Sequence, residues 1–199
     1  MKSTFIRSAD FELRDDGRTL TGRIVPYNEV ANVVDFDEET QTMVRYQETF
    51  LPHSLAAMAQ GFAARGGKFA NGQFIPLLID HNDNFDNMVG HATELRDEDD
   101  GAYASFRLYD DARITKIRSV LTESHTGLSI SFRDVRAPKI ANDIVQRVQV
   151  FVAHVAATPS PTYANAGILA IRSNEQCEPV TPLLNNVREW LATQKATNV

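Results

Sequence analysis

The chain has almost no cysteine and no excess of positive charge. Cys177 is its single cysteine in 199 residues, so an internal disulfide is excluded. Lysine and arginine number 20 against 26 aspartates and glutamates, which gives a formal net charge of −6. This balance offers no electrostatic footprint for nucleic acid or for an anionic membrane surface. We therefore expect neither a nucleic-acid partner nor a membrane partner.

Long apolar runs and metal-binding spacings are also missing. The apolar runs are well short of the roughly 18 residues that a membrane-spanning helix needs, and residues 1–4 do not begin an apolar secretory signal. The five histidines are scattered, without a His-Glu-x-x-His or Cys-x-x-Cys spacing. The polar surroundings of Cys177 would not stabilise a thiolate. We expect a cytoplasmic protein that uses no metal and no cofactor.

What the chain does have is the segment Gly-Leu-Ser-Ile-Ser-Phe at residues 127–132. Alternate side chains of a strand point to the same face, so Ser129 and Ser131 share one face while the apolar residues fill the other. Such a pair of hydroxyls is typical either of a solvated sheet face or of a nucleophile site. A serine becomes a nucleophile when a nearby base takes its proton and a third group orients that base.

Two histidines lie in similar strand settings. His81 follows the apolar run at residues 74–79, and His154 lies inside the run at residues 144–155. A histidine in an apolar run can equally be a core residue whose hydrogen bonds are satisfied. The residues alone therefore leave two interpretations open: structural histidines, or a base and its orienting partner for Ser129.

A series of different short motifs lies along the chain between about residue 18 and residue 172. They are Gly-Arg-Ile-Val-Pro-Tyr-Asn (22–28), Glu-Thr-Phe-Leu-Pro-His-Ser (48–54), Pro-Leu-Leu-Ile-Asp-His-Asn (76–82), Val-Gly-His (89–91), Glu-Leu (94–95), Asp-Asp-Gly (99–101), the 127–132 segment, and His-Val (154–155) ahead of Pro161. In this order they resemble the tailed-phage prohead (capsid-maturation) serine proteases, distant relatives of the herpesvirus protease assemblin.

The resemblance implies a role for each candidate residue. Ser129 falls on the family's nucleophile and His81 on its catalytic histidine, while His154 falls on the third member, giving a Ser-His-His triad as in the herpesvirus relatives. It also implies that backbone N–H groups of a loop around residues 133–136 hold the oxyanion. If His154 is not the third member, the nearby acids are the alternatives: Asp80, Asp83 and Glu94.

The resemblance further implies an endopeptidase of phage head maturation. Its substrates would be the scaffold protein or the scaffolding region of the major capsid protein, and the protease itself, cut in the host cytoplasm inside the assembling prohead. The alternative is a catalytically inactive barrel that acts as a scaffold or capsid-binding module. Ser131 in place of the family's usual glycine, and an unfamiliar segment at residues 156–161, keep that alternative open. A general hydrolase is disfavoured because no Gly-x-Ser-x-Gly elbow is present.

The pattern of short apolar runs predicts an α+β fold: a small, mainly antiparallel β-barrel with surrounding helices. The resemblance implies that this barrel is like that of the herpesvirus proteases. We predict strands at residues 19–25, 43–46, 74–79, 88–95, 102–108, 128–132, 144–155 and 168–171, and helices at 54–65 and 111–123. The acidic cluster ending at Gly101 predicts a hairpin turn with a positive φ at that glycine. Residues 31–40 and 65–73 read as loops.

Two units are expected along the chain. Residues 1–172 would form the prohead serine protease domain, and residues 173–199 a linker followed by a C-terminal amphipathic helix. Thr181 and Pro182 form a good helix start. The apolar stripe that follows is suited to packing on the barrel, on a second copy of the chain, or on a capsid partner: Leu183, Leu184, Val187, Trp190 and Leu191.

Overall fold

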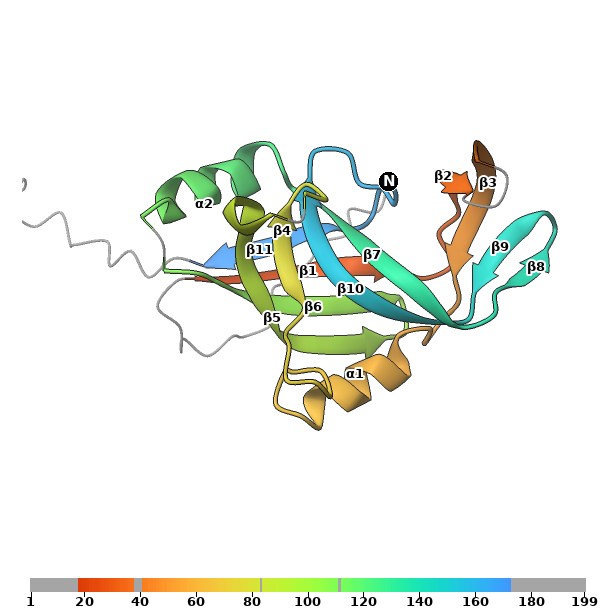
Figure 1. The fold of residues 1–199 in the computed structure, drawn as a ribbon, viewed down its shortest axis with the longest axis horizontal. Helices are drawn as coiled ribbons and strands as arrows, with labels where there is room; N and C mark the ends of the chain where they lie inside the picture. The colour runs from red at the N-terminus through yellow and green to blue at the C-terminus, as the bar shows by residue number, and fades with distance from the viewer. Residues whose placement is uncertain (1–17, 38–40, 83, 111, 173–199) are drawn as a thin grey trace, which may run out of the picture.

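Strands built on alternating burial make up most of the molecule. The computed structural model describes residues 18–37, 41–82, 84–110 and 112–172 (Figure 1). In β1 (Thr19–Pro26) and β6 (Gly101–Leu108), every second side chain turns into the core. The other elements, in chain order, are β2 (Ala31–Asp37), β3 (Thr42–Phe50), α1 (Ala56–Ala63), β4 (Pro76–Ile79), the 3-10 turn η1 (Phe85–Asn87), β5 (Met88–Glu98), α2 (Ile114–Glu123), β7 (Gly127–Arg136), β8 (Lys139–Ala141), β9 (Ile144–Arg147), β10 (Gln149–Thr158) and β11 (Gly167–Arg172).

Seven strands close into a barrel in the order β1-β11-β7-β10-β4-β5-β6. Neighbouring strands are antiparallel except β4 and β10, which run parallel. Closure pairs the strand edges that an open sheet would expose. The expected small, mainly antiparallel barrel accompanied by helices is thereby confirmed.

A second, four-stranded sheet in the order β2-β3-β9-β8 projects from one end of the barrel (Figure 1). It corrects two predictions. Residues 31–37 form strand β2 rather than a loop, because they pair along their whole length with β3. The single strand predicted at residues 144–155 is interrupted at Val148, so that β9 pairs with β3 while β10 enters the barrel.

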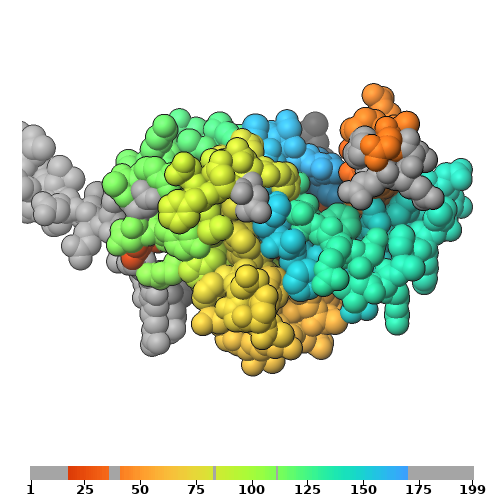
Figure 2. Space-filling model, viewed as in Figure 1, coloured from red at the N-terminus to blue at the C-terminus, as the bar shows by residue number. Residues whose placement is uncertain are grey.

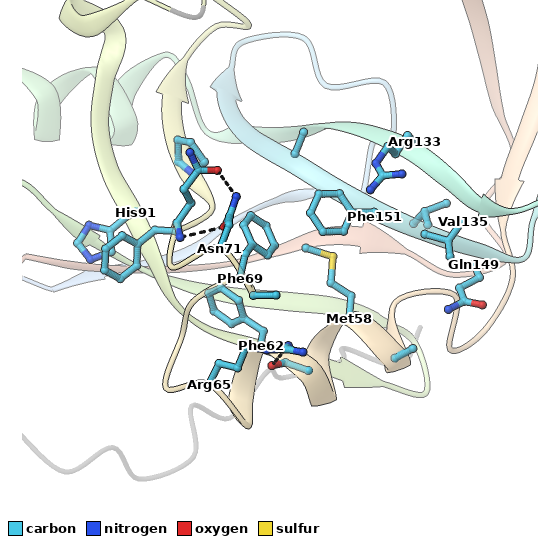
Figure 3. Close-up of a pocket in the computed structure, with 18 of the residues that line it drawn as sticks. Met58, Phe62, Arg65, Phe69, Asn71, His91, Arg133, Val135, Gln149 and Phe151 are labelled. Atoms are coloured by element: carbon cyan, nitrogen blue, oxygen red, sulfur yellow. Dashed lines mark hydrogen bonds between the residues drawn. The ribbon is translucent and has the colours of Figure 1, made fainter.

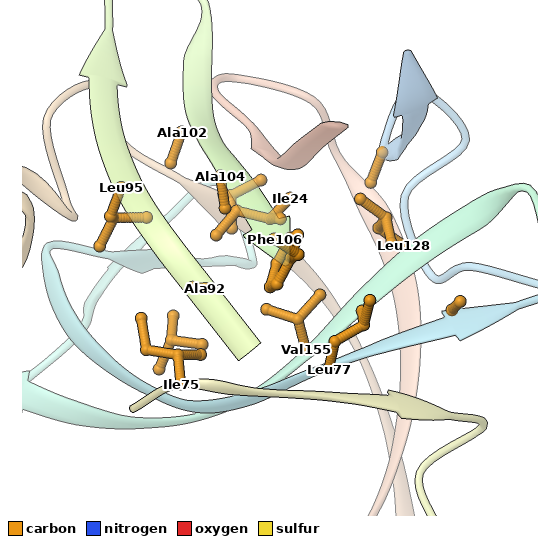
Figure 4. Close-up of a cluster of buried hydrophobic side chains, with 14 of the residues drawn as sticks. Ile24, Ile75, Leu77, Ala92, Leu95, Ala102, Ala104, Phe106, Leu128 and Val155 are labelled. Carbon is orange, nitrogen blue, oxygen red and sulfur yellow. The ribbon is translucent and has the colours of Figure 1, made fainter. Parts of the chain in front are cut away.

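The barrel interior is filled by large aliphatic and aromatic side chains (Figure 4). Leu77, Phe106 and Leu128 are fully buried there. At the end facing the small sheet, the Phe50 ring packs edge to face on Phe132 with a centroid distance of 5.0 Å. Each fully buried side chain contributes about 1.5–3 kcal/mol to folding. The inner face of β7 therefore stabilises the core, and its outer face is left for other roles.

The predicted β5–β6 hairpin is present, with Glu98 paired to Gly101. Gly101 is needed in this hairpin for a different reason from the positive φ that was expected. Among described glycines, positive φ values occur at Gly66, Gly67 and Gly72, not at Gly101. A Cβ on Gly101 would lie 2.5 Å from the carbonyl oxygen of Val25, so close strand packing excludes a side chain there.

The predicted linker and C-terminal helix at residues 173–199, and with them Cys177, lie outside the described residues. In the part of the chain that is described, neither helix is long and apolar enough to cross a membrane.

Candidate functional site

His81 and His154 come together although 73 residues separate them. The Nδ1 atom of His81 lies 2.9 Å from Nε2 of His154, within hydrogen-bond distance. His81 follows β4, where Asp80 takes a positive φ of 51° and donates its N–H to the carbonyl of Ala157 at 2.9 Å. This left-handed residue turns the chain back as soon as it leaves the sheet, which brings the His81 ring within reach of His154.

A bulge in β10 positions His154. Val152 pairs with Phe132 and His154 with Ser131, so Ala153 has no partner of its own on β7. A bulge of this kind inserts one extra residue and re-aims the next side chain. Val152 and Val155 on either side are buried in the core, whereas Ala153 is exposed and His154 is half-buried. Without the extra residue, strict alternation from Val152 would turn the His154 side chain into the core and the Val155 side chain out of it.

The register places both serines on the same outer face as His154. Ser131 lies directly opposite His154, and Ser129 lies opposite Ala156, one strand repeat further along. Ala156 pairs on its other side with Leu78 of β4, the strand that leads into His81. β4 continues to Ile79, paired with Ala157, and the turn at Asp80 then brings the His81 ring to His154, the residue opposite Ser131. In the described residues, neither serine hydroxyl is hydrogen-bonded to a histidine.

The surroundings of His81 favour its neutral form. Partial burial and the neighbouring His154 both lower the pKa of His81, and these effects outweigh the opposing charge of Asp80. A neutral imidazole carries one proton. With that proton on Nδ1, donated to Nε2 of His154, the Nε2 lone pair of His81 is free to accept a proton from a nucleophile.

Two of the three acids weighed as alternatives to His154 have other partners. The Asp80 carboxylate lies 3.5 Å from Nε2 of His125. Glu94 accepts a hydrogen bond from the Ser105 hydroxyl at 3.1 Å. Asp83 lies outside the described residues. The geometry therefore favours His154 as the residue that orients His81.

The loop expected at residues 133–136 is absent, and that prediction was wrong. These residues continue β7, with Arg133 paired to Phe151 and Arg136 paired to Gln149. The strand extends this far because β10 offers it a partner along its whole length, which residues 127–132 could not reveal by themselves.

A cavity of about 990 Å³ lies on the outer face of β7 and β10, close to the histidines but not lined by them (Figure 3). In the space-filling view, the surface of β10 lies beside that of the segment after α1 (Figure 2). Ala153, next to His154, lines it, as do Arg133 and Phe151. Figure 3 shows side chains from α1 and from the segment after it converging on the same space. Sequence reasoning did not identify this cavity, because its walls come from segments far apart in the chain.

A buried charged cluster beneath the site was also missed. Glu48 is only 3% exposed and accepts hydrogen bonds from Arg147 and from the Tyr163 hydroxyl, both at 2.7 Å. Arg147 also bridges to Asp134 at 2.7 Å. Burial and the Glu48 carboxylate raise the pKa of Tyr163, which therefore stays protonated as a donor. Glu48 and Ser129 line the same small cavity of about 110 Å³, together with Leu128 and Ile130.

Comparison with known proteins does not assign this chain to a family. No protein-family model matches the chain, and a search of curated proteins found no significant match. Within the described residues, no group of three histidine, cysteine, aspartate or glutamate side chains is arranged to hold a metal ion. The assignment of function therefore depends on the site and on the motifs of the chain.

Proposed function

We propose that the protein is a serine endopeptidase with Ser129 as nucleophile, His81 as general base and His154 as the residue that orients His81. The observation that carries the proposal is the 2.9 Å contact between the two histidines, beside two serines on one sheet face. Two imidazoles brought together from separate strands at a partly exposed face have no evident role in the core. At such a face, one imidazole can orient the other so that it acts as a general base.

The chemistry follows from these positions. Ser129 Oγ attacks the carbonyl carbon of the scissile bond as its proton passes to Nε2 of His81. The imidazolium that forms is held through Nδ1–H by Nε2 of His154. His81 then gives the proton to the leaving amine, and the acyl-enzyme is hydrolysed by a water molecule that His81 deprotonates in turn.

The substrate class comes from the motif order. We propose that the enzyme cuts the scaffold protein or the scaffolding region of the major capsid protein, and also itself, inside the assembling prohead in the host cytoplasm. The closed barrel with its helices is compatible with the likeness to the herpesvirus proteases. Self-association belongs to the same proposal.

The second candidate is an inactive barrel that binds scaffold or capsid protein. It is favoured by one observation: neither serine is hydrogen-bonded to a histidine in the described part of the chain. A fold can persist after its chemistry is lost.

An activated-serine reagent separates the two candidates. A fluorophosphonate probe should label the native protein at Ser129, located by peptide mass mapping, and should not label Ser129→Ala. Co-expression with a candidate capsid protein, followed by intact mass measurement, should show the capsid protein shortened at a defined bond. An unlabelled protein that binds the capsid chain without shortening it would establish the inactive barrel.

Loss of His154 should be less harmful than loss of His81. A neutral imidazole supports the His81 imidazolium less strongly than a carboxylate would, so its removal costs less than removal of the base itself. Turnover by His154→Ala should be slow but measurable, and turnover by His81→Ala should be at background, both followed as product formation under single-turnover conditions. An unchanged rate in His154→Ala would remove it from the site.

Activity should rise with pH through the titration of His81. Only the neutral form can take the Ser129 proton, and burial together with His154 lowers the pKa of His81. The midpoint of the acidic limb of kcat/KM should therefore lie below 6.5, the value of an unperturbed histidine. NMR titration of the His81 ring in Ser129→Ala, which preserves both histidines, provides the matching measurement. A midpoint above 6.5 in both experiments would contradict this environment for His81.

A further inference from the structure

We propose that the cavity beside the histidines selects substrates with a large apolar side chain next to a carboxylate, about four residues from the scissile bond. The inference rests on the proposed function, because it takes Ser129 as the point of attack. It adds the chemical class of substrate segment that the site recognises.

Continuity of the sheet face connects the cavity to the site. Ser129, Ser131, Arg133 and Val135 are alternate residues of β7, and the last two line the cavity. On β10, Phe151 is paired with Arg133, and His154 with Ser131. Four residues of strand separate Ser129 from Arg133, or about 13 Å at about 3.3 Å per residue. An extended peptide attacked at Ser129 therefore reaches Arg133 after about four residues.

The walls of the cavity suit an apolar side chain. Phe69 lies between Phe62 and Phe151, with ring centroids 6.0 Å and 4.8 Å away. Figure 3 shows these rings and Met58 facing the space between α1 and β10. Phe62 is buried in the core, whereas Met58, Phe69 and Phe151 are only half-buried. A large apolar group of the substrate would complete the burial of these three side chains.

The charges at the rim suit an anionic neighbour to that group. The cavity is lined by Arg65 and Arg133 and by no aspartate or glutamate. The Arg133 guanidinium lies 4.8 Å from the Phe151 ring and is paired with no carboxylate among the described residues. Arg147, which contacts the opposite face of β7, is by contrast bound to Glu48 and Asp134. In a chain of net charge −6, an unpaired arginine beside an apolar cavity selects for a carboxylate through charge complementarity.

Binding to Ser129→Ala tests the inference without requiring turnover. The probes are fluorescein-labelled ten-residue peptides of alanine, glycine and serine that carry one Phe-Glu pair, one Phe-Lys pair or one Ala-Glu pair, followed by fluorescence anisotropy. Phe-Glu should bind about tenfold or more tightly than either of the others. Adding Arg133→Glu should reverse the preference between Glu and Lys. Arg136→Ala, which removes a cation from the same strand outside the cavity, should leave it unchanged.

The active enzyme then tests position. With cleavable peptides, kcat/KM should be highest when the Phe-Glu pair lies about four residues from the cut bond and should fall when the pair is moved by two. Equal binding of all three peptides, or a preference that survives Arg133→Glu, would overturn the inference even if the enzyme cleaves. Selective binding without cleavage by the native chain would instead keep the cavity assignment and overturn the protease.

Discussion

Ser129→Ala should lower kcat by roughly 10⁴- to 10⁶-fold while leaving the fold intact, because it removes the attacking atom from a serine enzyme. The substitution deletes one hydroxyl from a half-buried position on the outer sheet face, so no core contact is lost. The rate is measured by mass spectrometry of substrate and product under single-turnover conditions. Circular dichroism and thermal unfolding confirm that the variant is folded.

Ser131→Ala is the matched control for this prediction. Ser131 shares the face and the strand with Ser129 and is paired directly with His154. It should keep most of the activity, because the proposal takes Ser129, on which the motif order places the nucleophile, as the attacking residue. The reverse result, with Ser131 essential and Ser129 dispensable, would move the nucleophile by one strand repeat and leave the two histidines in place.

Glu48→Ala should destabilise the protein by about 2–3 kcal/mol, since it leaves a buried hydroxyl without its acceptor and weakens a buried ion-pair cluster. Tyr163 would lose the acceptor for its hydroxyl, and Arg147 would lose one of its two carboxylate partners but keep Asp134. Both groups are largely buried. The free energy of unfolding is measured by urea titration, using the midpoint together with an unchanged slope.

Glu98→Ala provides the contrast. Glu98 is bridged to Arg96 at 3.2 Å, but both side chains are well exposed to solvent. Exposed pairs contribute less than about 1 kcal/mol, so this variant should unfold close to the native midpoint. Similar midpoints for the two variants would show that the Glu48 cluster is energetically no different from a surface pair.

The outer-face hydroxyls illustrate what local sequence can predict. Strand periodicity alone placed Ser129 and Ser131 on one face and the apolar residues of the same segment on the other, and the structure has this division. The barrel class could also be predicted, because the chain is rich in short apolar runs and some of its strands, such as β1 and β6, carry a clear alternation of their own. These features depend on residues two apart in the chain, which sequence shows directly.

The tertiary structure decided the features that depend on pairing. The sequence offered His81 and His154 as candidates, but only the turn at Asp80 and the bulge at Ala153 bring their rings together. The break at Val148, the strand at residues 31–37 and the continuation of β7 through Arg136 each require a partner strand from elsewhere. The cavity and the Glu48 cluster likewise join segments far apart in the chain. Alternation is a local property of an amino-acid sequence, whereas register, bulges and the pairing of buried charges are set by contacts between distant strands.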